Sequence, residues 1–106
     1  MAATAEADLA EILWWTAERF GENQARAYAD TLSAALDALI EGPAAIGVKA
    51  RDDIAEGILT LHVARLGRKG RHLIAFRARR DADGGFIEVL RILHDAMDLP
   101  RHLEEP

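Results

Sequence analysis

Four side chains that could do chemistry gather near the end of the sequence, in the stretch RILHDAMDLPRHL: Arg91, His94, Asp98 and His102. Imidazoles and carboxylates are the usual groups for zinc binding and for proton transfer. One helical face would align His94 with Asp98, but Pro100 interrupts any helix that continues to His102. Two histidines and one carboxylate form an incomplete zinc set. We therefore expect no metal site here and a polar surface instead.

Other catalytic groups are scarce in this sequence. The chain has no cysteine, which excludes disulfides, thiolate metal sites and cysteine nucleophiles. Its one serine, Ser33, falls in the middle of an expected helix. The pair Gly84-Gly85 is better explained as a turn than as a phosphate-binding loop. The sequence therefore predicts no catalytic residue and no cofactor.

The charge is distributed unevenly along the chain. The net charge is −5, yet residues 62–80 carry seven Lys and Arg residues and no acidic residue. The overall charge argues against a general nucleic-acid binder, whereas the basic segment could steer an acidic partner. Alternatively, these arginines pair with acidic side chains of the flanking segments on a solvated surface. Both interpretations remain open.

The length and composition are typical of one small domain. The chain has 106 residues, half of them hydrophobic, which suits one modest core spanning residues 1–106. No apolar run approaches the roughly 20 residues that span a bilayer. The opening MAATAEADLAE carries acidic residues where a signal peptide would be basic and then apolar. We expect a cytoplasmic protein without membrane contact.

Residues 5–41 have helical periodicity with one interruption. Four apolar residues would share one face of a first helix, from Ala5 to Phe20: Leu9, Ile12, Leu13 and Phe20. Thr4 is its candidate N-cap and Gly21 is placed to end it. A second helix should run from about residue 22 to 41, with a stripe of five residues: Tyr28, Leu32, Leu36, Leu39 and Ile40. The short link requires an antiparallel helical hairpin.

Two tryptophans lie outside the apolar face of the first helix. Trp14 and Trp15 fall on either side of it, near the opposite face. One of them could widen a core that contacts both a second helix and a sheet. Otherwise an exposed tryptophan marks a partner surface.

The periodicity changes to two after residue 57. Three strand-like runs follow, ILTLHVARL, RHLIAFRAR and FIEVLRIL, separated by the turn-like segments GRKG and DADGG. We interpret residues 42–57, which are rich in glycine and charge, as a loop. The sequence thus predicts an α+β domain in which the antiparallel helical hairpin (5–41) packs on a small antiparallel β-sheet. That sheet is a three-stranded meander (58–94), followed by a C-terminal tail (95–106).

Four stretches carry a resemblance to a known family: AEADLAEI, TAERFGENQA, GRHLIAFRAR and IEVLRILHDAMDLPRHL. They resemble the ParE branch of the RelE/ParE toxins, the toxic halves of bacterial toxin–antitoxin pairs. The resemblance covers residues 5–103 and is most specific at its end, where Arg91, His94, Asp98 and His102 match the ParE pattern. Family members usually open with a short strand. Here only Met1–Thr4 precede the helical pattern, so that strand should be very short or absent and one sheet edge less covered.

The resemblance implies one of two mechanisms. Toxins of the RelE branch cleave messenger RNA on the ribosome, which requires proton-transfer groups and cations on the phosphate. ParE toxins lack that catalytic set and inhibit DNA gyrase. Leu93 is apolar where a nuclease would want a proton-transfer group, which favours gyrase inhibition. His72 and His94 with nearby arginines keep the RNase alternative open. A degenerate, non-toxic binding module of the same fold is the third alternative.

The resemblance also implies a ParD-like antitoxin, with a DNA-binding amino-terminal part and a disordered tail that folds over the toxin. Operator DNA would be contacted only indirectly, through the antitoxin. Candidate antitoxin-binding residues are the aromatics of the first helix and three arginines: Trp14, Trp15, Arg65, Arg71 and Arg77. The candidates for gyrase contact are Arg91, His94, Asp98 and His102. We expect the last strand to end near His94, with Ile92 and Leu93 on opposite faces and a tail beyond that presents the toxic surface.

Overall fold

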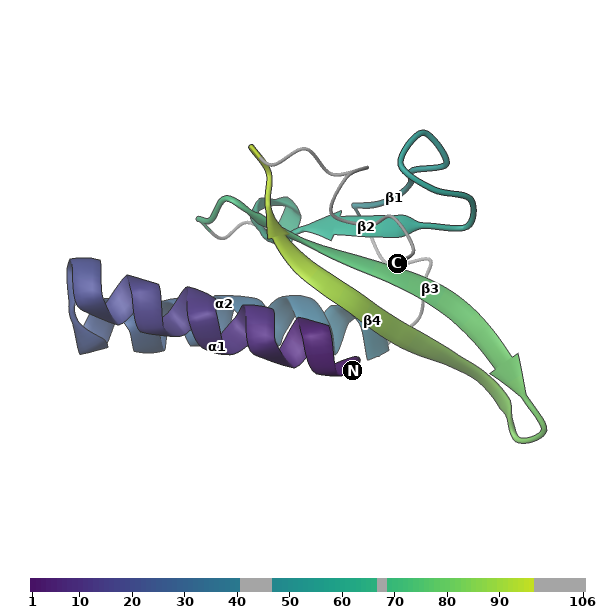
Figure 1. The fold of residues 1–106 in the computed structure, drawn as a ribbon, viewed down its shortest axis with the longest axis horizontal. Coiled ribbons are helices and arrows are strands. Elements are labelled where there is room, and N and C mark those ends of the chain that lie inside the picture. Colours follow the sequence, from purple (N-terminus) through teal and green to yellow (C-terminus); the bar gives the residue numbers. More distant parts are fainter. Residues whose placement is uncertain (41–46, 67–68, 97–106) are drawn as a thin grey trace.

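The computed structural model describes residues 1–40, 47–66 and 69–96, with the backbone alone at Arg65 and Leu66. Two helices, α1 (Ala3–Phe20) and α2 (Glu22–Ile40), form an antiparallel hairpin. The strands are β1 (Val48–Ala50), β2 (Leu59–His62), β3 (His72–Asp81) and β4 (Gly84–His94). They form one antiparallel sheet in the order β1-β2-β3-β4. The helices lie together on one face of this sheet (Figure 1), which confirms the predicted α+β fold class.

The helical hairpin turns at the predicted glycine but begins earlier than predicted. Gly21 has a φ of 92° and its N–H donates to the Ala17 carbonyl at 2.9 Å, so it ends α1 as expected. The predicted N-cap is wrong. The helix starts at Ala3, Ala2 occupies the cap position without a side-chain bond, and Thr4 lies inside the helix. The predicted end of the second helix, Glu41, lies outside the described residues.

The sheet differs from the prediction in two places. Val48–Ala50, within the predicted loop, pair with β2 and add a fourth strand. The run ILTLHVARL is a strand only as far as His62, because Val63–Leu66 form a 3-10 helix. GRKG therefore does not connect two strands directly. The period of two could not reveal this change, since Val63 is buried in the core in the 3-10 turn as it would be in a strand. The predicted turn at DADGG is confirmed, since Asp81 pairs with Gly84.

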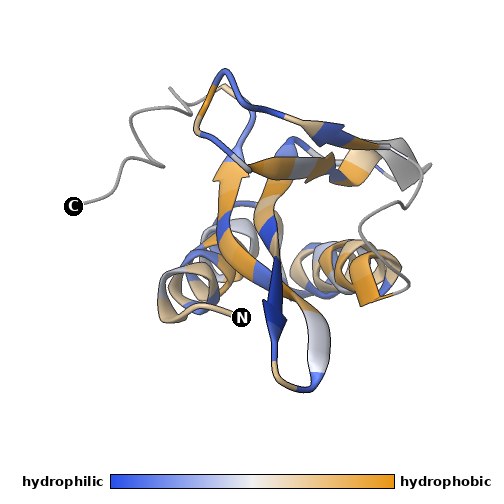
Figure 2. Cartoon of the chain, turned by 90° about the vertical axis from the view of Figure 1, so that its right-hand side faces the viewer, coloured by the Kyte–Doolittle hydropathy of each residue, from blue (hydrophilic) through white to orange (hydrophobic). Residues whose placement is uncertain are grey.

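The first half of β3 and the last residues of β4 are buried on both faces of the sheet. Toward the helices, Ile74, Phe76 and Ile92 join the larger core with Leu32 and Leu39 of α2. On the opposite face a smaller core contains four residues, one of them from the segment between β1 and β2: Ile54, Leu73, Ala75 and Leu93. Ile92 and Leu93 thus lie on opposite faces, as predicted. Figure 2 shows hydrophobic residues along the parts of the strands above the helices.

Some residues of the predicted helix stripes are exposed. Leu9, Ile12 and Leu13 pack against the core, but 65% of Phe20 and 81% of Ile40 are exposed. The hairpin extends past the sheet at the end where α1 meets α2 (Figure 1), so Phe20 has no strand to cover it. Trp14 and Trp15 are 66% and 47% exposed, so neither widens the core.

The outer edge of β4 is covered by the start of the chain. No strand precedes α1 in the part of the chain described here. Instead the Ala2 N–H donates to the Val89 carbonyl at 2.9 Å, and the Ile92 N–H donates to Asp8 Oδ2 at 3.0 Å. The edge that the sequence predicts to be less covered is therefore capped at these two positions.

Candidate functional site

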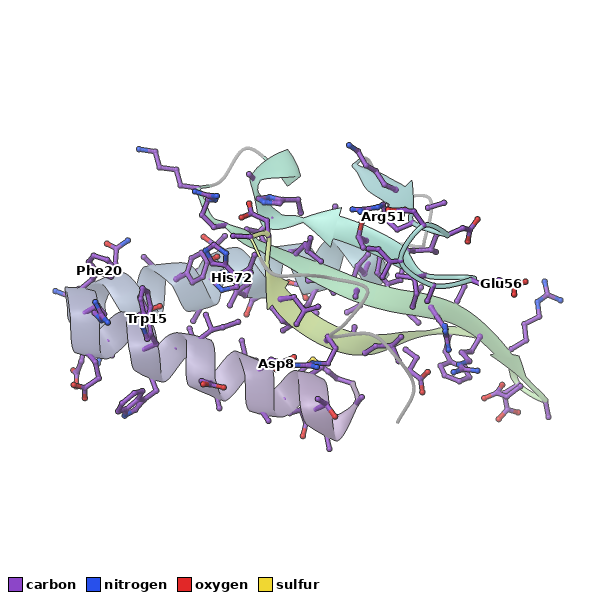
Figure 3. The ribbon with its side chains drawn as sticks, turned by 45° about the horizontal axis from the view of Figure 1, so that its top comes forward. Asp8, Trp15, Phe20, Arg51, Glu56 and His72 are labelled. Atoms are coloured by element: carbon purple, nitrogen blue, oxygen red, sulfur yellow. The ribbon has the colours of Figure 1, made fainter. Side chains whose placement is uncertain are left out.

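A groove of about 790 Å³ lies between α1, from Asp8 to Phe20, and the part of the sheet where β3 begins and β4 ends. We call it the helix–sheet groove. The helical hairpin contributes Trp15, Phe20 and Tyr28 to one wall of the groove, the aromatic wall. The residue before β3 and the end of β4 contribute Arg71, Arg91 and His94 to the other wall. Trp15 and Phe20 form an edge-to-face pair with ring centroids 5.9 Å apart. Figure 3 shows Trp15 and Phe20 on the hairpin and His72 on the sheet.

Three aromatic side chains are in contact along one end of the groove. The Tyr28 hydroxyl on α2 lies 2.6 Å from His72 Nδ1 on β3. His72 meets His94, its cross-strand partner on β4, edge to face with ring centroids 5.3 Å apart. The Ala96 N–H donates to His94 Nδ1 at 3.1 Å. A continuous set of contacts therefore runs from α2 to the first residues after β4.

The burial of His72 keeps its ring neutral. Desolvation, together with the positive charge that His94 would carry when protonated, lowers the pKa of His72 to about 4. Burial likewise raises the pKa of Tyr28. Both rings are uncharged at neutral pH, so they hold each other by a hydrogen bond rather than by an ion pair.

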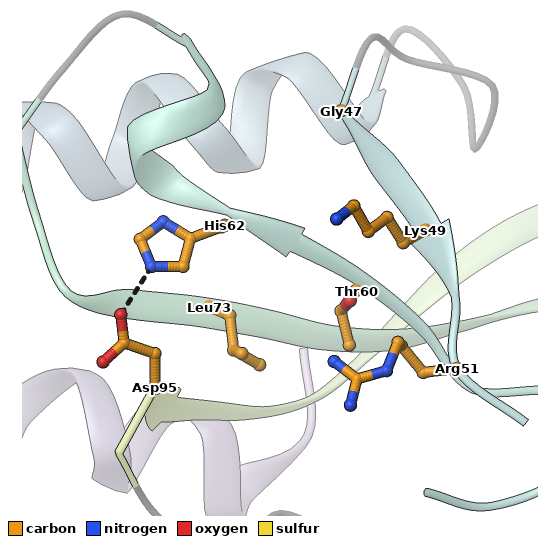
Figure 4. A pocket seen from close by; sticks show the side chains of 7 residues that line it. All are labelled: Gly47, Lys49, Arg51, Thr60, His62, Leu73 and Asp95. Atoms are coloured by element: carbon orange, nitrogen blue, oxygen red, sulfur yellow. Dashed lines mark hydrogen bonds and ion pairs between the residues drawn. The ribbon is translucent and has the colours of Figure 1, made fainter. Parts of the chain in front are cut away.

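A second hollow, of about 460 Å³, lies on the opposite face of the sheet (Figure 4). Lys49 and Arg51 line it beside Asp95, whose Oδ2 accepts a 2.9 Å hydrogen bond from His62 Nε2. The Arg71 guanidinium, 3.1 Å away, and then His62 lower the pKa of Asp95 to about 2. Asp95 thereby ties the chain just after β4 to β2 and to the residue before β3.

Arg91 is less available than the sequence suggested. Its Nε and one terminal nitrogen donate to the Asp8 carboxylate at 2.7 and 3.0 Å, with only 24% of the Arg91 side chain exposed. The same carboxylate accepts the Ile92 N–H, so Asp8 binds a side chain and the backbone of β4 together. A partner that uses Arg91 has to share it with Asp8.

The predicted site residues are only partly brought together. The groove holds Arg91 and His94 from the gyrase set, and Trp15 and Arg71 from the antitoxin set. Trp14 is exposed but does not line the groove, and Arg77 donates to the Glu56 carbonyl instead. Asp98, His102 and the side chain of Arg65 lie outside the described residues.

The basic segment is partly neutralised by acidic neighbours. Arg71 pairs with Asp95, and Arg79 pairs with Glu88 across the β3–β4 hairpin. This supports the interpretation that arginines of residues 62–80 pair with flanking acids. The pairing leaves 70% of the Arg71 side chain exposed where it lines the groove.

Sequence reasoning missed three residues of the site: Asp8, Phe20 as a groove residue, and Tyr28. Periodicity predicts only that Phe20 and Tyr28 lie on the apolar faces of their helices, because it reports which face a residue is on and not where the sheet ends. Asp8 carries no local signal, since its partners Arg91 and Ile92 are more than 80 residues away in the sequence.

Within the described residues, no group of three or more His, Asp or Glu side chains is arranged to hold a metal ion. Neither described helix is long and apolar enough to cross a membrane.

The free energy of unfolding should decrease as the pH falls from about 6.5 to about 4. His72 has a pKa of about 4 in the folded protein against 6.5 for an unperturbed histidine. Between these values the unfolded chain binds the extra proton, and above about 6.5 the contribution is constant. The slope should be at most about 1.4 kcal/mol per pH unit, and less because His72 is partly exposed. Denaturant titrations at several pH values measure it.

The control for this experiment is the His72→Asn variant. Asparagine keeps a polar group near the Tyr28 hydroxyl but does not titrate. Its stability should depend on pH less steeply than that of the wild type over the same range. Equal slopes in the two proteins would show that His72 is not held neutral by the fold.

Comparison with known proteins identifies the family. Residues 1–99 match the family model described as ParE toxin of type II toxin-antitoxin system, parDE. The chain is also 34% identical over 103 residues to Toxin ParE1 of Mycobacterium tuberculosis, in the strains CDC 1551 and H37Rv, covering 97% of this chain and 94% of each relative. The resemblance seen in the sequence is therefore confirmed over almost the whole chain. This chain belongs to the ParE toxin family of type II toxin–antitoxin systems.

Proposed function

We propose that this toxin inhibits DNA gyrase in the cytoplasm and is neutralised by a ParD-like antitoxin that occupies the helix–sheet groove. Membership of the ParE family makes it a toxin with an antitoxin partner. One observation supports the proposed antitoxin site and target most directly. The groove holds Trp15 and Arg71, which are expected to bind the antitoxin, together with Arg91 and His94, which are expected to contact gyrase. An antitoxin bound in the groove would therefore cover Arg91 and His94 and prevent gyrase from contacting them.

The histidines support binding rather than catalysis. Both ring nitrogens of His62 are engaged, with Asp95 and with the Ala64 N–H. The Nδ1 atoms of His72 and His94 are engaged as well. Leu93, next to His94, is buried in the smaller core and offers no proton-transfer group. A nuclease would need an acid and a base free to exchange protons with RNA.

The groove has the character of a peptide-binding site. Its hydrophobic wall includes Ile12, Trp15 and Phe20, and Lys69 and Arg71 supply positive charge at one end. An antitoxin segment that folds on binding would place apolar side chains on the aromatic wall and an acidic side chain near these cations. Trp15 is well placed to be an anchor because it is half exposed, contacts the Phe20 ring edge to face and has the Arg19 guanidinium 5.2 Å from its ring.

Purified protein should inhibit supercoiling by gyrase and cause cleaved DNA to accumulate, while messenger RNA on ribosomes stays intact. The two assays separate the two branches of the superfamily. Site-specific cleavage of ribosome-bound message would instead establish the RelE mechanism, with His72, His94 and the arginines beside them in the groove as the first residues to test. Unimpaired bacterial growth at high expression would favour a degenerate module.

Replacement of Trp15 by alanine should weaken antitoxin binding by roughly 30-fold or more, as loss of a central aromatic anchor does. The matched control is Phe86→Ala, which removes a ring that is also 46% exposed but lies on β4 away from the groove. Binding of the antitoxin is measured by calorimetry. Equal affinities of the two variants would place the antitoxin elsewhere.

A further inference from the structure

We infer that Tyr28 and His72 are positioning residues for toxicity: through His94 they fix the turn at which the chain leaves β4. Both residues line the helix–sheet groove, but neither is among the residues expected to contact the target. The inference rests on the proposed function, because it assumes that the residues after β4 face gyrase. It adds that α2, far from that tail in the sequence, determines how the tail begins.

The last contact of the series defines the turn. The Ala96 N–H donates to His94 Nδ1 two residues earlier, as backbone N–H groups donate to Asn or Asp side chains in tight turns. Because a backbone N–H can only donate, His94 Nδ1 is the acceptor of this bond, and Asp95 Oδ1 lies 3.6 Å from the same nitrogen. The orientation of the His94 ring therefore sets the backbone at Asp95 and Ala96.

The His94 ring is oriented by its neighbour and not by its own strand alone. His72 is the cross-strand partner of His94, and the two rings are nearly perpendicular, with an interplanar angle of 85°. The Tyr28 hydroxyl fixes the rotation of the His72 ring at 2.6 Å. Tyr28 is itself held in place, since a Cβ added at Gly70 would lie 2.8 Å from its ring and its hydroxyl. The series Tyr28–His72–His94–Ala96 thus has little freedom.

A second set of bonds fixes the same turn from the other face of the sheet. The Asp95 N–H donates to the Arg71 carbonyl at 2.8 Å, and the Asp95 carboxylate binds Arg71 and His62. These bonds hold Asp95 in place, while the His94 contact directs the next peptide. Loss of the Tyr28 hydroxyl should therefore loosen Ala96 without releasing β4.

The test is the Tyr28→Phe variant of the full chain, which keeps the ring and removes only the hydroxyl. The hydrogen-exchange rate of the Ala96 amide, measured by NMR, should rise about fivefold, as expected when one ordinary hydrogen bond is weakened. The concentration needed to inhibit gyrase should increase by a similar factor. His72→Asn, which removes the ring between Tyr28 and His94, should have both effects as well.

Thr31→Val is the matched control, because it removes a hydroxyl from the same helix that bonds only within the helix, to the Ala27 carbonyl. It should change neither Ala96 exchange nor inhibition, even if it lowers the melting temperature as much as Tyr28→Phe. Unchanged Ala96 exchange in Tyr28→Phe would overturn the inference, and so would faster exchange with unchanged inhibition.

The experiment distinguishes an error in the proposed target from an error in the proposed positioning role. If the wild-type protein arrests growth without inhibiting gyrase, the target is wrong and the same variants are compared by growth arrest. Weaker arrest in Tyr28→Phe and His72→Asn, together with faster Ala96 exchange, would still support the positioning role. Full arrest in both variants would overturn it.

Discussion

The carboxylate of Asp8 joins α1 to the outer strand of the sheet, and the shape of the groove depends on it. An edge strand presents unpaired backbone groups that must be covered or remain open to other chains. In this protein Asp8 accepts the Ile92 N–H and the Arg91 guanidinium, and Ala2 bonds to Val89. Only 12% of the Asp8 side chain and 24% of the Arg91 side chain are exposed. Loss of Asp8 would therefore remove the carboxylate that balances the largely buried charge of Arg91. The helix therefore does at this edge what a first strand would do.

This anchoring has a consequence for control of the toxin. The helix α1 is held near its start by Asp8, and Trp15 and Phe20 line the groove nearer its other end (Figure 3). The same space contains Arg91 and His94. One occupant can thus contact the aromatic wall together with Arg91 and His94, the side chains that we propose face the target. Neutralisation by such an occupant needs no change in the fold of the toxin.

The sequence predicted correctly the helices and strands whose patterns lie within a few neighbouring residues. It did not predict features that depend on contacts between residues far apart in the chain. Helical periodicity, the glycine at the hairpin turn and the alternation in β3 and β4 sufficed for the fold class, since each is set within a few residues. The three residues of β1 are too few to show a period. The exposure of Phe20 depends on where the sheet ends. The role of Asp8 depends on its contact with β4, near the other end of the sequence. The role of Tyr28 depends in the same way on its hydrogen bond with His72.

Hydrogen exchange at the Ile92 amide is the most direct test that α1 seals the edge of the sheet. If the Ile92 N–H donates to Asp8, this amide should exchange slowly, although it points outward from an edge strand. Asp8→Ala should accelerate it roughly fivefold or more, whereas Asp37→Ala, the same change at an exposed position of α2, should not. Rapid exchange of the Ile92 amide in the wild-type protein, at the rate of an open strand edge, would contradict this account.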